Sequence, residues 1–368
     1  MAACNSTGIR IIVNSLPSGT PETDNIYVAG NFNTWNPADS AYLLQRDKNG
    51  NLFVELPTQP LSEWEFKFTR GSWQTVECEA DGSETQNRRV KVTQRSKYIK
   101  INNWRDFSPN IPERKHTCSK NVSILADSFF MPQLNRYRKI IVYLPPSYTT
   151  SNQRYPVVYM HDGQNLFDEA TSLSCEWKID ETLDMFSAKG IEEAIVIGIY
   201  HGDEYRIEEL TPWENTENGG GNGNNYLNFI VETLKPYVDS HLRTSPEREF
   251  TAIGGSSLGG LISFYAALKY PQIFSQSYIF SPSFWFSEEI FKMAEDFEKQ
   301  YSQQFYFLCG EQESQSMVAD MKRMTEILQA KGFTNRELHQ KIVRGGKHNE
   351  TFWSKEFPQA YKWFMKRI

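Results

Sequence analysis

The chain has 368 residues, which is enough for two domains that each bury a hydrophobic core. Hydrophobic residues make up 39% of the chain and charged residues 23%, a composition typical of folded globular proteins and not of disordered ones. The net charge of −6, without a long basic run, argues against nucleic acid as a partner. The sequence contains no run of about 18 apolar residues, so no transmembrane segment is predicted.

The cysteines and the N-terminus give little information about the compartment. The scattered, odd-numbered cysteines predict neither a zinc site nor a disulfide framework. The start "MAACNSTG" has no basic and apolar leader of the kind that a signal peptide needs. We therefore expect a cytoplasmic protein or, if Cys4 is the remnant of a lipoprotein signal, a cell-envelope or secreted one.

Residues 1–103 are predicted to form an all-β sandwich domain. Short runs such as "IRIIVNSL", "NIYVAGNF" and "EFKFTRG" are rich in β-branched and aromatic residues, and turn clusters such as "PSGTPETD" separate them. Strands at this spacing are typical of β-sandwiches. The polar segment 104–120, which contains two prolines, is predicted to be a linker.

Residues 121–368 are predicted to form an α/β domain, because strand-like and helical stretches alternate. The strand-like runs include "KIIVYLP", "YPVVYMHDG", "EAIVIGIY", "FTAIGGSS", "SQSYIFSPS", "QFYFLCG" and "ELHQKIVRGGKH". The helical ones are "KIDETLDMFSAKG", "NYLNFIVETLKPYVDSHL", "LGGLISFYAALKY" and "MVADMKRMTEILQAKG". This alternation predicts a mostly parallel sheet with helices on both faces, whose ligands bind at the carboxyl ends of the strands.

The stretch "TAIGGSSLGG" carries the first sign of catalysis. It follows an apolar strand and opens an apolar helix, which is the context of a G-x-S-x-G nucleophile elbow. The pattern aligns Gly255, Ser257 and Gly259, so the second serine and not Ser256 is the predicted nucleophile. The alternative is a glycine-rich turn without a catalytic role.

A nucleophilic serine needs a base and an orienting carboxylate, which follow it in the order acid and then histidine in α/β-hydrolases. His348 in "HQKIVRGGKHNETFW" is the histidine with both this order and a loop position. "FYFLCGEQES" provides the acid, for which Glu313 is our choice and Glu311 the fallback.

The turn "YMHDGQNLFDE" after an early strand is predicted to contribute to an oxyanion hole. The backbone N–H of Gln164 would form one half of the hole and the N–H of Leu258 the other half. Asp162 and Asp168 in this turn lack the spacing of metal ligands. The alternative is a polar turn at the end of a strand without a catalytic role. We expect neither a metal ion nor another cofactor.

From about residue 120 to 368 the chain resembles the esterase family of α/β-hydrolases. This family includes enterochelin, feruloyl and acetylxylan esterases, S-formylglutathione hydrolase and mycolyltransferases. The resemblance rests on "VYLPPSY", "YMHDGQNLFD", "EELTPW", "NYLNFIVETLKPYVD", "GGSSLGG", "FSPSFW", "CGEQES" and "GGKHNETFW". It implies Ser257 as nucleophile, Glu313 as acid and His348 as base, with Gln164 and Leu258 as oxyanion donors. Many relatives carry aspartate where this chain has Glu313.

The first domain resembles starch- and glycogen-binding modules, which implies an immunoglobulin-like sandwich. The matching stretches are "VAGNFNTWNP" and "EFKFTRGSWQTVECEADGSETQNRRVKV". The resemblance implies sugar contacts at Trp35, Lys67, Trp73 and Asn87, with the tryptophan rings stacked on pyranose faces. The alternative is a packed spacer in which both tryptophans are core residues.

These features together predict a serine carboxylic-ester hydrolase that acts on an acyl ester of a carbohydrate, such as a feruloyl or acetyl ester. The loop "EELTPWENTENGGGNGNN" is expected to line the pocket, with Arg206 and Trp213 near its entrance as substrate-binding residues. Three alternatives stay open: an enterochelin-type siderophore esterase, an acyltransferase to a sugar, and a non-catalytic glucan-binding protein. The expected partners are a small-molecule or polysaccharide ester and a glucan, not nucleic acid.

Overall fold

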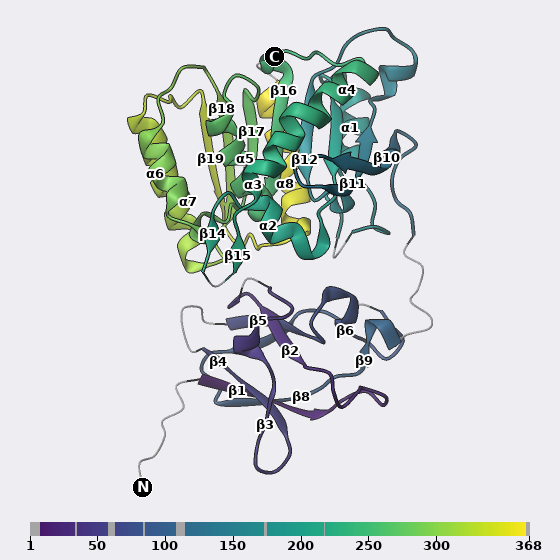
Figure 1. Ribbon diagram of the computed structural model, residues 1–368, viewed down its shortest axis with the longest axis vertical. Coiled ribbons are helices and arrows are strands. Elements are labelled where there is room, and N and C mark those ends of the chain that lie inside the picture. Colours follow the sequence, from purple (N-terminus) through teal and green to yellow (C-terminus); the bar gives the residue numbers. More distant parts are fainter. Residues whose placement is uncertain are drawn as a thin grey trace. The chain divides into compact units, whose positions relative to one another are not determined.

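The computed structural model describes residues 8–33, 35–57, 63–83, 85–107, 115–172, 175–216 and 218–365. The chain divides into two compact units, Met1–Arg114 and Lys115–Ile368, which we call the first and second unit (Figure 1). Cys4, on which the predicted alternative of a lipoprotein rested, lies outside the described residues.

The described regular elements of the first unit are β-strands and short 3-10 helices. They form sheets in the strand orders β3-β4-β1-β8, β2-β5-β7 and β6-β9. The strands are β1 (Gly8–Ser15), β2 (Tyr27–Gly30), β3 (Gln45–Arg46), β4 (Leu52–Pro57), β5 (Glu63–Thr69), β6 (Glu77–Cys78), β7 (Arg88–Lys91), β8 (Ser96–Lys100) and β9 (Asn103–Trp104). Ile11 of β1 and Phe66 of β5 belong to one core cluster, so the two larger sheets share a hydrophobic core. The immunoglobulin-like sandwich stays a prediction.

Both described ends of the segment predicted as a linker, 104–120, are anchored. Trp104 is fully buried in the first unit, and its Nε1 donates a hydrogen bond to Thr20 Oγ1 at 2.8 Å. The backbone N–H of Ser119 donates to Asp180 Oδ2 at 2.6 Å in the second unit. Residues 108–114 of the segment lie outside the described residues.

The second unit is built on an eight-stranded mixed sheet in the order β10-β11-β13-β12-β16-β17-β18-β19. The pairs β10–β11 and β11–β13 are antiparallel, and all the other neighbours are parallel. The strands are β10 (Val122–Met131), β11 (Arg136–Tyr143), β12 (Val157–His161), β13 (Ile195–Ile199), β16 (Thr251–Ser256), β17 (Gln276–Phe280), β18 (Gln304–Gly310) and β19 (Leu338–Val343). The sheet therefore has the mostly parallel character that the sequence predicts.

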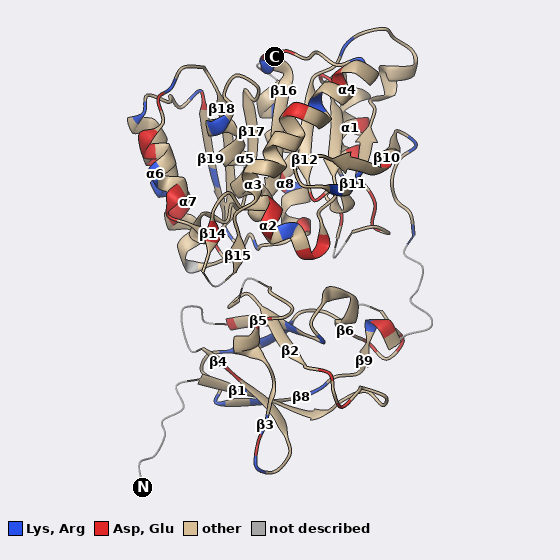
Figure 2. Ribbon diagram, in the orientation of Figure 1, with Lys and Arg blue, Asp and Glu red and all other residues tan. Residues whose placement is uncertain are grey.

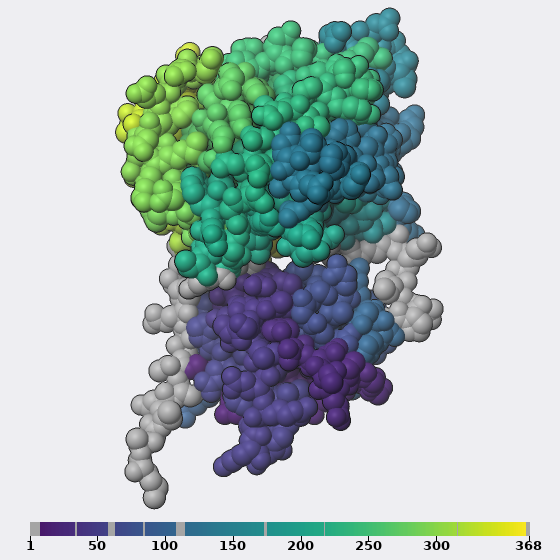
Figure 3. All heavy atoms as spheres, viewed as in Figure 1, coloured from purple at the N-terminus to yellow at the C-terminus, as the bar shows by residue number. Residues whose placement is uncertain are grey.

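Helices cover both faces of this sheet. They are α1 (Ile179–Ser187), α2 (Arg206–Leu210), α3 (Gly223–Asn228), α4 (Lys235–His241), α5 (Leu258–Lys269), α6 (Glu289–Asp296), α7 (Gln315–Ala330) and α8 (Glu350–Met365). One core cluster joins the sheet to α2–α7, and the other joins it to α1 and α8. Val157 and Tyr159 of β12 face the first cluster and Val158 and Met160 the second, because successive side chains of a strand point to opposite faces. In the space-filling view, the teal and green segments that include α2–α5 cover one face (Figure 3).

Several elements differ from the sequence-based expectation. The predicted loop "EELTPWENTENGGGNGNN" contains the end of α2 and a small hairpin, β14 (Glu214–Asn215) and β15 (Gly219–Gly220). The helix predicted over residues 225–242 contains a π-helical turn, Phe229–Leu234, between α3 and α4. Helix α6 was not predicted. Figure 2 shows acidic and lysine residues along this helix. Among the described residues, none of the helices is long and apolar enough to cross a membrane.

The burial of Trp104 leads to a test of the first unit. Trp104→Ala should lower the free energy of unfolding of this unit by about 3–5 kcal/mol, because it removes a large ring from a closed core. Tyr98→Ala is the control, since 67% of Tyr98 is exposed and its loss should cost less than about 0.5 kcal/mol. Urea unfolding of the full chain measures both, and equal effects of the two variants would contradict this placement of Trp104.

Candidate active site

Ser257 lies at a strained junction between β16 and α5. Its φ of 58° and ψ of −122° are unfavourable for a residue with a side chain, and such strain is a feature of nucleophile elbows. A Cβ on Gly255 would lie 3.1 Å from the carbonyl carbon of Gly259, so a larger residue here would require the turn to shift by a few tenths of an ångström. Ser257 is half-buried, whereas Ser256 at the end of β16 is buried.

The loop after β17, Ser281–Ser283, holds Ser257 from one side. The N–H of Ser257 donates to the carbonyl of Phe280, and the N–H of Ser283 donates to the carbonyl of Ser257, both at 3.0 Å. The two hydroxyl oxygens, Ser257 Oγ and Ser283 Oγ, are 3.3 Å apart. The serine is therefore fixed through its backbone while its hydroxyl keeps a single weak contact within the described part of the chain.

Glu313 and His348 form a hydrogen-bonded pair after β18 and β19. His348 Nδ1 lies 2.9 Å from Glu313 Oε2. The other carboxylate oxygen, Oε1, accepts hydrogen bonds from Ser281 Oγ at 2.7 Å and from the N–H of Gly310 at 2.6 Å. Trp353 donates its Nε1–H to Ser281 Oγ at 2.8 Å and lies edge-on to the imidazole ring of His348. Glu313 is therefore buried, and both of its carboxylate oxygens have hydrogen-bond partners.

The structure distinguishes the two candidate acids. Glu311 is exposed, and its backbone N–H donates to the carbonyl of Val343 at 3.1 Å.

Among the described residues, no hydrogen bond joins Ser257 to His348. The loop after β17 connects the two groups, because Ser283 contacts Ser257 and Ser281 contacts Glu313. In enzymes without bound substrate, such nucleophile–base contacts are often long.

The loop that carries Gln164 lies against the elbow. It begins at Asp162, which has a left-handed φ of 54°, and continues as a short 3-10 helix, Gly163–Asn165. A Cβ on Gly259 would lie 3.5 Å from Asp162 Oδ2, so this loop and the start of α5 are in contact. The first N–H groups of a helix have no partner within it, which makes the N–H groups of Gln164 and Leu258 available to an anion.

Arg206 forms a two-point ion pair with Asp162. Arg206 Nε lies 2.7 Å from Asp162 Oδ1, and Nη2 lies 2.8 Å from Oδ2. Burial opposes ionisation of Asp162, but the guanidinium outweighs it and holds the pKa of this carboxyl below its usual value. Nearby Glu350, whose pKa burial raises to about 7, accepts a hydrogen bond from Asn165 Nδ2 at 3.3 Å. The positive charge of Arg206 is therefore largely neutralised within the protein.

Trp213, the second residue predicted at the pocket entrance, packs against α5. Its ring meets the ring of Tyr265 at nearly a right angle, with 5.2 Å between the ring centroids. The residue is half-buried against the core of the second unit. This contact fixes the start of the loop that contains β14 and β15.

In the first unit the structure brings together the two predicted sugar-binding rings. The ring centroids of Trp35 and Trp73 are 6.3 Å apart, and both residues are half-buried. Lys67 on β5 is buried, with 8% of its surface exposed. Asn87 is exposed, and its Nδ2 lies 3.4 Å from Glu65 Oε2.

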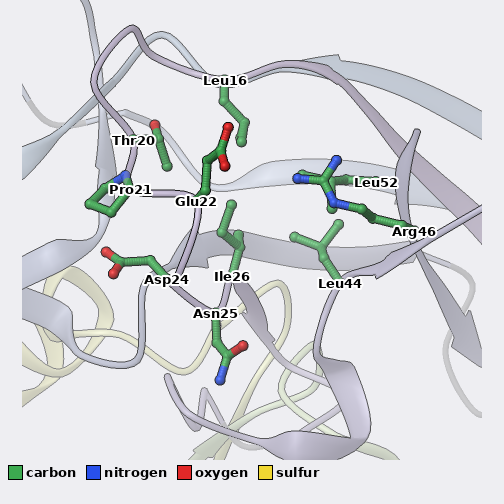
Figure 4. A pocket seen from close by; sticks show the side chains of 10 residues that line it. All are labelled: Leu16, Thr20, Pro21, Glu22, Asp24, Asn25, Ile26, Leu44, Arg46 and Leu52. Atoms are coloured by element: carbon green, nitrogen blue, oxygen red, sulfur yellow. The ribbon is translucent and has the colours of Figure 1, made fainter. Parts of the chain in front are cut away.

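A pocket of about 220 Å³ lies elsewhere in the first unit (Figure 4). Its lining residues are Leu16, Thr20, Pro21, Glu22, Asp24, Asn25, Ile26, Leu44, Arg46 and Leu52. The four residues predicted to contact sugar are not among them. This pocket is therefore separate from both sites that the sequence predicted.

Sequence reasoning missed the residues that support the predicted ones. Ser281, Ser283 and Trp353 hold the serine and the acid, and Asp162 engages Arg206. The position of Ser281 directly after an apolar strand was a usable signal, because the carboxyl ends of parallel strands meet at one edge. The partners of Trp353 and Asp162 are distant in the sequence and gave no such signal.

Two curated relatives match different lengths of the chain. The uncharacterized protein YbbA of Bacillus subtilis (strain 168) is 29% identical over 239 residues, which cover 61% of this chain and 92% of YbbA. An α-amylase of Niallia circulans is 36% identical over 94 residues, which cover 25% of this chain and 7% of that enzyme.

Two solved structures share the fold. A ferulic acid esterase has a TM-score of 0.53 at 17% identity and covers 67% of this chain and 98% of its own. The enterobactin esterase FES from Shigella flexneri has a TM-score of 0.54 at 14% identity and covers 93% of this chain and 88% of its own. This likeness confirms the α/β-hydrolase part of the predicted fold.

The esterase family described as "Putative esterase" matches residues 132–364. The matched segment is more than half of the chain, lies within the second unit and contains Ser257, Glu313 and His348. The non-catalytic alternative is therefore not supported. The chain belongs to this family of esterases and is a carboxylic ester hydrolase.

Proposed function

We propose that the chain is a serine esterase that works through Ser257, His348 and Glu313. The observation that supports this most is the 2.9 Å hydrogen bond between His348 Nδ1 and Glu313 Oε2. A carboxylate at Nδ1 fixes the imidazole tautomer that leaves Nε2 free to accept the proton of the serine. The three residues also follow strands β16, β18 and β19, which run parallel to one another in the sheet.

The proposed reaction has two stages. Ser257 Oγ attacks the acyl carbon while His348 takes its proton, and the N–H groups of Gln164 and Leu258 stabilise the oxyanion, at about 3 kcal/mol for each donor. His348 then protonates the leaving alcohol, and water cleaves the acyl-enzyme with the same base. Glu313 stabilises the imidazolium that forms in each stage. The proposed steps use only these groups.

We propose an acyl ester of a carbohydrate, such as a feruloyl or acetyl ester, as the substrate. Because Asp162 neutralises Arg206, this side of the site does not favour a strongly anionic substrate. The adjacent rings of Trp35 and Trp73 suit the stacking of a sugar, for which we propose the first unit as a binding module. The match to an α-amylase and the fold shared with a ferulic acid esterase agree with this choice.

A siderophore esterase is the second candidate. The fold likeness to the enterobactin esterase covers 93% of this chain, which is more than the second unit alone provides. A panel of feruloylated sugars, acetylated sugars and catecholate siderophores separates the two candidates by kcat/KM. Acyl transfer is distinguished by product analysis with and without an acceptor sugar, because it differs from hydrolysis only in the group that meets the acyl-enzyme.

The choice between the two adjacent serines can be tested with p-nitrophenyl acetate. Ser257→Ala should abolish hydrolysis, with a loss of kcat of about 10⁶-fold, because no acyl-enzyme can form. Ser256→Ala, the matched control, should retain activity within about tenfold because Ser256 is the buried end of β16. Loss of activity in Ser256→Ala with retention in Ser257→Ala would refute the assignment.

A second matched pair of variants tests the assignment of the acid. Glu313→Gln should lower kcat by about 10⁴-fold, because a neutral amide cannot stabilise the imidazolium. Glu311→Gln, two residues away and exposed, should change kcat less than about twofold. Steady-state kinetics on one ester measure both variants, and a larger loss in Glu311→Gln would show that Glu313 is not the acid.

Glucan binding by the first unit can be measured by affinity electrophoresis in gels that contain starch or glycogen. The full chain should be retarded, and the double variant Trp35→Ala/Trp73→Ala should bind at least about tenfold more weakly because it loses both rings. Trp285→Ala removes an exposed tryptophan of the second unit and serves as the control. Equal retardation of the double variant and the unmodified chain would exclude these rings as the glucan site.

A further inference from the structure

Three carboxylates gather where the chain enters α1. Glu176, Asp180 and Glu181 each offer an oxygen, and these oxygens lie within 4.8 Å of one another. Glu176 is 2% exposed and Asp180 is fully buried, while Glu181 is exposed. Two of the three carboxylates are therefore withdrawn from water.

Two buried oxygens of this cluster lack a hydrogen-bond partner among the described residues. Within the described part of the chain, Glu176 Oε2 and Asp180 Oδ1 are buried without a hydrogen bond. Asp180 Oδ2 accepts the N–H of Ser119 at 2.6 Å, which satisfies only one side of that carboxylate. A buried oxygen without a partner destabilises the folded state, more so when it is charged, and a bound ligand would remove this cost.

The N-terminus of α1 does not explain this arrangement. The dipole of a helix stabilises acidic residues in its first turn, which accounts for the exposed Glu181. The dipole supplies no partner atoms to Glu176 Oε2 or Asp180 Oδ1. It accounts for the charge at the helix end but not for the two orphaned oxygens.

A neighbouring cluster, His116, Cys118 and Asp168, differs in this respect. Asp168 Oδ2 lies 2.6 Å from His116 Nδ1, and Oδ1 accepts the N–H groups of Thr117 at 3.1 Å and Ala170 at 3.0 Å. Its carboxylate is fully engaged by the protein, so this cluster needs no further ligand.

We propose that Glu176, Asp180 and Glu181 bind a hard divalent cation of the Ca²⁺ type. Their donors are all carboxylate oxygens, which such cations prefer, and the cluster offers no imidazole or thiolate that would select zinc. The exposed Glu181 provides the path of entry, and water completes the coordination. None of the three carboxylates belongs to the residues proposed for the serine chemistry.

The position of the site predicts how a bound cation would affect the second unit. The N–H of Trp177 donates to the carbonyl of Asn165 at 2.7 Å, and the N–H of Ile179 donates to the carbonyl of Leu166 at 3.1 Å. Trp177 and Ile179 are therefore tied to Asn165 and Leu166, at the end of the loop that carries Gln164, and Asp180 is tied to Ser119. A bound cation would hold three segments of the second unit together and would stabilise its folded state.

The experiment uses the full-length chain after removal of metal with a chelator. Calorimetric titration with CaCl2 should show one ion per chain, and thermal unfolding should show a Tm that rises by about 2–4 °C with saturation. Tb³⁺ is a second probe, because excitation of Trp177 beside the site should sensitise its luminescence, and CaCl2 should displace it. A chain that binds no Ca²⁺ and keeps the same Tm up to about 1 mM CaCl2 would overturn the proposal.

Variants localise the ion. Glu181→Gln changes an exposed residue, so the protein should fold and bind Ca²⁺ at least about tenfold more weakly. Glu176→Gln/Asp180→Asn should abolish binding. His116→Ala, in the neighbouring cluster, is the matched control and should bind as the unmodified chain does. Unchanged affinity in Glu181→Gln, or loss of binding only in His116→Ala, would place the ion elsewhere and refute the proposed ligands.

Discussion

The strained backbone of Ser257 is the constraint on which the site depends. A residue with φ of 58° and ψ of −122° persists only where its surroundings fix it. The surroundings do so through tight backbone packing, because a Cβ on Gly260 would lie 2.8 Å from the carbonyl oxygen of Phe280. The same packing brings the loop after β17 against the serine. The glycines of the elbow thus serve to fix both the serine and its neighbours.

The loop after β17 connects the proposed nucleophile to the proposed acid. Ser283 contacts Ser257, while Ser281 holds Glu313 together with the N–H of Gly310. The hydrogen bond from Gly310 turns the side chain of Glu313 back toward the end of β18. In this position Glu313 Oε2 lies 2.9 Å from His348 Nδ1. The geometry of the pair depends on this loop as much as on β18 and β19.

The sequence predicted those features that depend on local patterns. Apolar runs between turn residues marked the strands of the sheet, and the glycines around Ser257 marked the elbow. The half-exposed strand β10, the short helix α2 and the buried Trp104 were missed, because each is stabilised by contacts with distant parts of the chain. The candidate catalytic residues could be predicted from the sequence because each follows a strand. Their supporting contacts, such as Trp353 with Ser281, depend on tertiary structure.

Covalent labelling tests the central claim most directly. The chain is treated with a fluorophosphonate, which reacts with serines that an adjacent base activates, and the modified residue is located by peptide mass spectrometry. We expect one label per chain, on Ser257, and its loss when His348 is replaced by alanine. A label on another residue, or labelling of Ser257 that does not depend on His348, would contradict the account.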